Sequence, residues 1–168
     1  WQRYENGVVF AYDMQAADIN ADGKPEIIAT SEIDGSWIYF PGTKPDKKWK
    51  KVKLGEGVPG GISPQGIGDM EGDGDLDIVC SNRWFDNLDG TGTSWGEHKT
   101  LRFVESLGKY AYSSRVYVID MDGDKDMDVI QCESNNPAGR LVWHENKDGK
   151  GVTWYMHPIA TDTEQDLH

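Results

Sequence analysis

An acidic segment of ten residues recurs three times along the chain at equal intervals. The copies begin at Asp18, Asp69 and Asp120, so each start lies 51 residues after the one before it. Equal spacing is typical of repeat proteins, in which each repeat is one supersecondary unit that buries its apolar face against the next. The repeat therefore restricts the chain to folds that are built from stacked or radially arranged units of one kind.

Each acidic segment opens a unit with the same order of residue types. In the third unit an apolar run (129–130) is followed by an aromatic-rich run (140–144), a turn rich in Gly and Asp (146–151) and a run that opens with Trp (154–157). The runs are short, rich in β-branched and aromatic residues, and show no sustained period of about 3.6 residues. A unit of about 40–50 residues with four short strands is typical of a β-propeller blade. We therefore predict an all-β fold of propeller blades, each with four antiparallel strands.

The phasing of the units predicts one propeller segment over residues 1–168. Its blades are expected at about 12–54, 63–104 and 114–160, with 1–7 as the outer strand of a preceding blade and 164–168 as the start of a next blade. A closed propeller ring typically needs roughly four to eight blades. Open blades expose sheet edges and apolar faces, which favours association. We therefore expect further blades as partners, supplied either by a longer chain or by other copies that complete a ring.

The acidic segments carry a pattern of oxygen side chains that suits a hard cation. Positions 1, 3 and 5 carry Asp, Asn or Glu, position 9 is acidic, and position 7 can supply a backbone carbonyl, as in the leading half of an EF-hand loop. Oxygen ligands without His or Cys favour Ca²⁺ over transition metals, and Mg²⁺ prefers to keep its waters. We expect up to three Ca²⁺ ions, one per repeat, whereas the alternative is a solvated turn that only aids solubility. The predicted ligands are Asp18, Asn20, Asp22, Lys24 and Glu26, then Asp69, Glu71, Asp73, Asp75 and Asp77, then Asp120, Asp122, Asp124, Asp126 and Asp128.

The three loops are not equivalent. The first contains Asn20, Pro25 and Glu26, so its site is expected to be the weakest. In the third loop Lys125 stands where the other two have Gly, and a side chain there costs free energy if φ is positive.

The charge of the chain argues against several classes of partner. The formal net charge is −12 at pH 7. Nucleic-acid binders normally present a basic face, and anionic membrane surfaces attract basic segments, so we expect neither partner. No apolar run approaches the roughly 20 residues of a membrane span, so membrane insertion is not expected. The acidity suits cation binding or a salty medium, and simple solubility is the alternative.

The third unit resembles the FG-GAP/VCBS repeats of integrin-α-like proteins. The residues that carry the resemblance are the acidic loop 120–129, the run Trp143-His-Glu-Asn146 with the Asp-Gly-Lys-Gly turn, and 154–157. The second unit departs from this pattern at 85–90, and the first lacks the Glu-Asn pair altogether. The resemblance implies a calcium-binding β-propeller, generally secreted or on the cell surface, with the periplasm as a further location. One fold of this kind hosts many functions.

In the resembling propellers the strand before each acidic loop lines a central channel. By that resemblance Tyr12, Asp13, Tyr110, Tyr112 and Arg115 are candidates for binding a glycan or a protein ligand. Aromatic rings could stack on sugars, and Asp or Arg could bond hydroxyl or carboxylate groups. The alternative is that these are polar groups at strand ends with no ligand.

Three functions remain open on the sequence. The first is an extracellular, calcium-stabilised binding or scaffold module, and the second is a structural unit that completes a ring by oligomerisation. The third is part of a polysaccharide lyase or another carbohydrate-active enzyme, with Tyr110, Tyr112, Arg115 and His168 as contributors of a base and a charge neutraliser. No spacing fixes a catalytic set, and no P-loop, dinucleotide fingerprint or Ser/His/Asp pattern occurs in the sequence. We therefore assign no catalytic residue and favour the module.

Two other sets of repeated residues are interpreted as structural. Trp49, Trp95 and Trp154 recur at equivalent positions, which predicts packing within or between blades, because aromatic burial dominates core energetics. A sugar-binding platform is the alternative. His98 and His157 are equivalent members of the repeat and are expected to be structural rather than catalytic.

Overall fold

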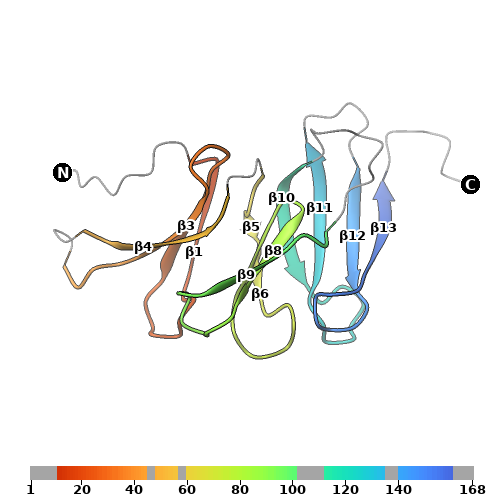
Figure 1. Ribbon diagram of the computed structural model, residues 1–168. Helices are drawn as coiled ribbons and strands as arrows, with labels where there is room; N and C mark the ends of the chain where they lie inside the picture. Colours follow the sequence, from red (N-terminus) through yellow and green to blue (C-terminus); the bar gives the residue numbers. More distant parts are fainter. Residues whose placement is uncertain (1–10, 45–47, 57–59, 102–111, 135–139, 161–168) are drawn as a thin grey trace, which may run out of the picture.

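The computed structural model describes residues 11–44, 48–56, 60–101, 112–134 and 140–160, and these ranges fold into β-strands with no helix (Figure 1). The predicted all-β fold is therefore confirmed. Within the same ranges there is also no helix long and apolar enough to cross a membrane.

Three four-stranded antiparallel units, which we call blades 1, 2 and 3, follow one another along the chain and lie side by side without closing a ring (Figure 1). Blade 1 contains β1 (Asp13–Ala17), β2 (Glu26–Thr30), β3 (Ser36–Phe40) and β4 (Lys50–Gly55). Blade 2 contains β6 (Ile67–Gly68), β7 (Asp77–Cys80), β8 (Arg83–Asn87) and β9 (Trp95–His98). Blade 3 contains β10 (Tyr112–Ile119), β11 (Asp128–Ser134), β12 (Leu141–Asn146) and β13 (Trp154–Ala160).

The strand register repeats with the same interval as the sequence. Ile27 pairs with Tyr39 in blade 1, Ile78 with Phe85 in blade 2, and Val129 with His144 in blade 3. Side chains of a strand alternate between the two faces of its sheet. Residues that are equivalent by register therefore lie on the same face of their blades.

A short strand before β6 departs from the simple pattern of one inner strand per blade. Strand β5 (Pro64–Gln65) pairs in parallel with β10 and so joins the sheet of blade 3, while β6 stays in blade 2. Gly66 separates the two strands, and a Cβ atom there would lie 2.4 Å from the carbonyl oxygen of Ile62 and 2.7 Å from that of Val79. A glycine is required because the backbone passes this close to its neighbours.

The apolar core lies between the blades rather than inside any one of them. Ile28 and Ile38 of blade 1 pack with Ile78 and Phe85 of blade 2 in one cluster. A second cluster joins Val79 and Trp84 of blade 2 to Val116, Val118 and Val129 of blade 3. Each of these blades thus buries apolar side chains against its neighbour, which is the arrangement expected of a repeat that cannot form a core alone.

Each acidic loop connects the first strand of its blade to the second: β1 to β2, β6 to β7 and β10 to β11. The loops span 18–25, 69–76 and 120–127 and lie at the same edge of the array, the lower edge in Figure 1.

Candidate functional site

The first carboxylate of each acidic loop organises the loop backbone. Asp120 accepts hydrogen bonds from the backbone N–H of Gly123 at 2.7 Å and of Lys125 at 3.1 Å. Asp18 and Asp69 accept equivalent bonds within their own loops. These side chain-to-backbone bonds hold the turn in place without help from a helix or a sheet.

The third loop brings three of its five predicted ligands together. Asp122 accepts a hydrogen bond from the backbone N–H of Asp124 at 3.2 Å, and Asp124 accepts one from Asp126 at 2.9 Å. One carboxylate oxygen each from Asp120, Asp122 and Asp124 lies within 4.8 Å of the others. Oxygens at this separation can share a cation whose ligand distances are about 2.3–2.6 Å.

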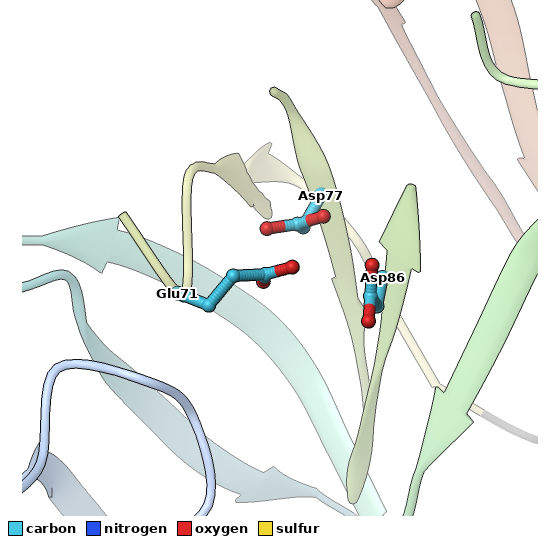
Figure 2. Close-up of side chains that lie close together, drawn as sticks. All are labelled: Glu71, Asp77 and Asp86. Atoms are coloured by element: carbon cyan, nitrogen blue, oxygen red, sulfur yellow. The ribbon is translucent and has the colours of Figure 1, made fainter. Parts of the chain in front are cut away.

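The second loop forms a different cluster from the one expected (Figure 2). Glu71 and Asp77 lie with Asp86, and an oxygen from each falls within 4.8 Å of the others. Asp86 comes from β8 and was not among the predicted ligands. One sequence signal could have revealed Asp86. It directly precedes Asn87, as Glu145 directly precedes Asn146 in blade 3, so an acidic residue recurs at this position.

Other predicted ligands do not join a cluster of three acidic groups. Asp69, Asp73 and Asp75 lie outside the group around Glu71, and Asp126 and Asp128 lie outside the group of the third loop. The first loop forms no such group among the described residues. In the first loop Asn20 accepts a hydrogen bond from the backbone N–H of Asp22, as Asp122 does from Asp124, but it adds no carboxylate.

The acidic residue at position 9 of each loop is buried and accepts backbone hydrogen bonds. Asp77 accepts from the N–H of Met70 at 2.8 Å and from that of Asn87 at 2.9 Å. Asp128 makes the two equivalent bonds in blade 3, and Glu26 accepts from the second residue of its loop in blade 1. In blades 2 and 3 this carboxylate thus joins the start of the acidic loop to the end of the third strand of the blade, which is β8 or β12.

The cluster around Glu71 is electrostatically costly when all three groups are ionised. Burial and the nearby charges of Asp77 and Asp86 raise the pKa of Glu71 to about 9. Burial also raises the pKa of Asp77, although the N–H groups of Met70 and Asn87 oppose the shift. At neutral pH the cluster therefore retains a proton unless a cation takes its place.

A comparison with protein families matches the model described as "FG-GAP-like repeat" to two overlapping segments, 18–80 and 69–131. Each segment starts at an acidic loop and ends in the strand after the next loop. Together the matches cover more than half of the 168 residues. The chain belongs to the FG-GAP-like repeat family. Comparisons with curated proteins and with solved structures give no significant match.

The candidate ligand-binding residues of these FG-GAP-like repeats lie in different surroundings. Tyr12 is 47% exposed, and Arg115 is exposed on β10. Asp13 instead joins blade 1 to the segment before β5, because its carboxylate accepts hydrogen bonds from the backbone N–H groups of Ile62 and Ser63 and from the Ser63 hydroxyl. The role of these residues in ligand binding stays a prediction.

The remaining candidates cannot be placed in a site. The backbone of Tyr112 opens β10. Tyr110 and His168 lie outside the described residues.

Two FG-GAP-like blades share a Trp–His–carboxylate arrangement. The ring of His98 stacks on Trp84 with centroids 4.2 Å apart, and its Nε2 lies 3.4 Å from Asp86. In blade 3, His157 stacks on Trp143 at 4.2 Å and its Nε2 lies 2.8 Å from Glu145. Each histidine is thus held by packing and by an acidic partner, in keeping with the structural role expected of it.

The Trp residues that open the fourth strands also make structural contacts. The indole N–H groups of Trp95 and Trp154 donate to the carbonyls of Gly92 and Gly151 at 2.9 and 2.7 Å. Both rings are packed against the inter-blade clusters, in keeping with the packing expected from their recurrence.

Proposed function

We propose that the chain is a calcium-stabilised binding or scaffold module in which Ca²⁺ ions occupy the acidic loops. The observation that carries the proposal is the convergence of Asp120, Asp122 and Asp124 within 4.8 Å in a loop whose backbone their own carboxylates already organise. A site that is folded before the ion arrives requires little reorganisation on binding.

The donor set fits Ca²⁺ better than other ions. All the clustered groups are carboxylates, which are hard oxygen ligands and suit Ca²⁺ in flexible geometry. The cluster of Glu71, Asp77 and Asp86 supports the same conclusion, because neighbouring acids that resist ionisation together gain most from a divalent cation.

Thermal unfolding with and without Ca²⁺ tests the proposal. An ion that binds only the folded chain adds about 2.7 kcal/mol of stability at one hundred times its Kd, so the Tm should rise with Ca²⁺ and fall with a chelator. The triple variant Asp120→Asn, Asp122→Asn, Asp124→Asn should lose much of the rise. The exposed pair Glu32→Gln and Asp34→Asn, which also removes charge, should keep it. Equal melting in Ca²⁺ and in chelator would contradict the metal assignment.

We further infer that the module acts outside the cytoplasm. The support is the family assignment together with acidic loops that are largely exposed. Extracellular calcium modules bind with Kd values of about 10⁻⁴–10⁻³ M, which requires the Ca²⁺ concentrations found outside cells. A Kd in the nanomolar range, measured by calorimetry, would contradict this location.

The ligand of the module is proposed to be a glycan or a protein that contacts Tyr12 and Arg115. Both side chains are exposed, and an aromatic ring with a guanidinium group can serve sugar or protein recognition. Binding to a glycan array, or capture of a protein that is lost in both Tyr12→Ala and Arg115→Ala, would support this. Tyr155→Ala, at another exposed tyrosine, is the matched control.

A further inference from the structure

The fourth strand of blade 1 is basic, although the chain as a whole is acidic. The formal net charge of the chain is −12, yet residues 48–55 contain four lysines and no acidic residue. The lysines are Lys48, Lys50, Lys51 and Lys53, and all four are exposed. Strand β4 and the residues just before it therefore form a local basic surface.

Strand β4 also lies at the edge of its sheet. The strand order of blade 1 is β1-β2-β3-β4, so β4 pairs with β3 on one side and with no described strand on the other (Figure 1). Blade 1 packs against blade 2 through side chains such as Ile28 and Ile38 on the face of its sheet. The free edge of β4 thus presents backbone N–H and C=O groups with which a further strand can pair.

The outer strands of the other two blades are less suited to such pairing. Strand β9 has only four residues, and β13 contains Pro158, which has no backbone N–H. Short edge strands and proline are two devices by which natural sheets prevent further strands from adding. Strand β4 has six residues and no proline, so its lysines alone decide which strands can approach.

Two of these lysines have aromatic neighbours in place of acidic ones. The Nζ atom of Lys51 lies 4.2 Å from the centroid of the Trp37 ring, and that of Lys50 lies 5.1 Å from the centroid of Phe40. Neither lysine forms an ion pair with any residue that the structure describes. An aromatic face attracts a cation without neutralising its charge. Both ammonium groups are therefore positioned and still lack a counter-ion.

Blade 2 shows how the same position is neutralised elsewhere. By register Lys51 is equivalent to Glu97, and Trp37 is equivalent to Arg83. Glu97 forms an ion pair with Arg83, so in blade 2 the charge on the outer strand is balanced within the blade. In blade 1 the balancing group is replaced by an indole ring, and the charge of Lys51 remains for a partner outside the blade.

The alternation of side chains along β4 defines what a partner strand must carry. Lys50 and Val52 lie on one face of the sheet, and Lys51 and Lys53 lie on the other. Opposite charges on adjacent strands stabilise the pairing, whereas like charges directly opposite one another destabilise it. A second copy of β4 would place lysine beside lysine and is disfavoured. A strand with acidic side chains beside the lysines is favoured.

We propose that the free edge of β4 binds an extended acidic peptide as an additional β-strand. Carboxylates lie opposite Lys50, Lys51 and Lys53, and an apolar side chain lies opposite Val52. The backbone of β4 supplies the pairing, and the lysines select the sequence of the partner. This site is separate from the acidic loops and from Tyr12 and Arg115, so the proposal rests neither on calcium binding nor on the ligand proposed above.

A synthetic peptide of sequence Thr-Glu-Val-Glu-Glu-Thr provides the first test. Paired antiparallel with β4, it places its four central residues opposite Lys53, Val52, Lys51 and Lys50 in that order. Titration into the full chain should show saturable binding that weakens as salt rises, and bound peptide should slow deuterium exchange of the β4 backbone amides. Measurement in chelator prevents Ca²⁺ from bridging the peptide to the acidic loops and keeps the result independent of the metal assignment.

Two control peptides separate strand pairing from simple charge attraction. A peptide with Gln in place of each Glu keeps the strand and removes the charge. A peptide with Pro in place of Val keeps the charge but cannot form the strand. Each should bind at least about tenfold more weakly, because opposite charges and backbone pairing both contribute.

Substitutions in the chain locate the binding to β4. Lys50→Gln with Lys51→Gln should weaken binding of the acidic peptide by about tenfold. The matched pair Lys125→Gln and Lys150→Gln removes the same charge at exposed positions outside β4 and should leave binding unchanged. Lys50→Glu with Lys51→Glu should instead bind a peptide with Lys in place of each Glu. That reversal also shows that the variant is folded.

Four results would overturn the proposal. They are no binding of the acidic peptide, equal binding of the proline peptide, unchanged exchange of the β4 amides in the complex, and equal affinity of the Lys50→Gln, Lys51→Gln variant. Heparin, a sulfated polysaccharide, is tested as a competitor. Tighter binding of heparin than of the peptide, without protection of the β4 amides, would assign the lysines to an anionic glycan and would also overturn the proposal.

Discussion

Asp128 in β11 accepts a hydrogen bond from the backbone N–H of Asn146 at the end of β12, 2.9 Å away. Its other oxygen accepts from the N–H of Met121, so one buried side chain joins the acidic loop to the end of β12. There the side-chain amide of Asn146 donates to the carbonyl of Met70 in blade 2. We expect Asp128→Asn to lower the free energy of unfolding by about 1–3 kcal/mol, because an amide nitrogen replaces one acceptor and leaves a buried donor unsatisfied. Urea denaturation in chelator measures this without any contribution from metal. Asp34→Asn, at an exposed position, should change the free energy of unfolding little. Equal effects of Asp34→Asn and Asp128→Asn would refute the role given to Asp128.

Lys125 should be strained where the other two loops have glycine. Its φ is 84°, close to the values of 84° for Gly23 and 99° for Gly74. We expect Lys125→Gly to raise the free energy of unfolding by about 1 kcal/mol, since a side chain in this region is disfavoured. Gly74→Ala is the converse control and should lower it by a similar amount, because a Cβ there meets nothing within 4 Å and only the backbone is affected. A Lys125→Gly variant no more stable than the parent chain would argue against strain at this position.

The cluster around Glu71 should make the stability in chelator fall as pH rises. The folded chain holds a proton on Glu71 up to about pH 9, whereas an ordinary glutamate releases it near pH 4.5. The unfolded state therefore binds fewer protons across this range, and stability declines from about pH 4.5 toward pH 9. Glu71→Gln should reduce the slope of Tm against pH in chelator. A slope that is the same in both proteins would show that Glu71 is not the group responsible.

His144 should have the opposite effect at acid pH. Burial lowers the pKa of His144 to about 4, below the ordinary value of 6.5, so the folded chain keeps the ring neutral. The unfolded chain takes up a proton first, and stability is therefore lost as pH falls from about 6.5 to about 4. His144→Phe should remove this loss, because blade 2 carries Phe85 at the same register position. Thermal melts of the parent chain and of His144→Phe between these pH values test the prediction. Curves of Tm against pH that run parallel in the two proteins would contradict the role given to His144.

The first acidic loop should contribute less to calcium binding than the third. The third loop gathers three carboxylates, whereas the first has Asn20 in the same position as Asp122 and forms no such group among the described residues. Asp120→Asn should therefore remove more of the calcium-induced rise in Tm than Asp18→Asn does. The two substitutions change the same loop position and the same charge, so each controls for the other. A larger loss with Asp18→Asn would reverse the order of the sites.

Repetition made the fold predictable from the sequence. Three acidic segments at one interval, each followed by short β-rich runs, indicated four strands per unit, and the register now repeats at equivalent positions such as Ile27, Ile78 and Val129. The exchange of β5 into the next sheet could not be predicted, because it depends on how closely the backbone around Gly66 approaches Ile62 and Val79.

The site was predictable where its residues are local in sequence. Asp120, Asp122 and Asp124 belong to one loop, and spacing alone placed them together. Asp86 was missed because it reaches the second cluster from a different strand, so its part depends on the pairing of β7 with β8. Asp13 could not be recognised from sequence as a link to the segment before β5, since its partners Ile62 and Ser63 lie 49 and 50 residues away.

The contacts between turns and acidic loops run in one direction along the chain. The side-chain amides of Asn87 and Asn146 donate to the carbonyls of Ile19 and Met70, each in the acidic loop of the blade before. A substitution at either Asn therefore removes a bond to the blade on its N-terminal side and leaves the bonds on its C-terminal side intact.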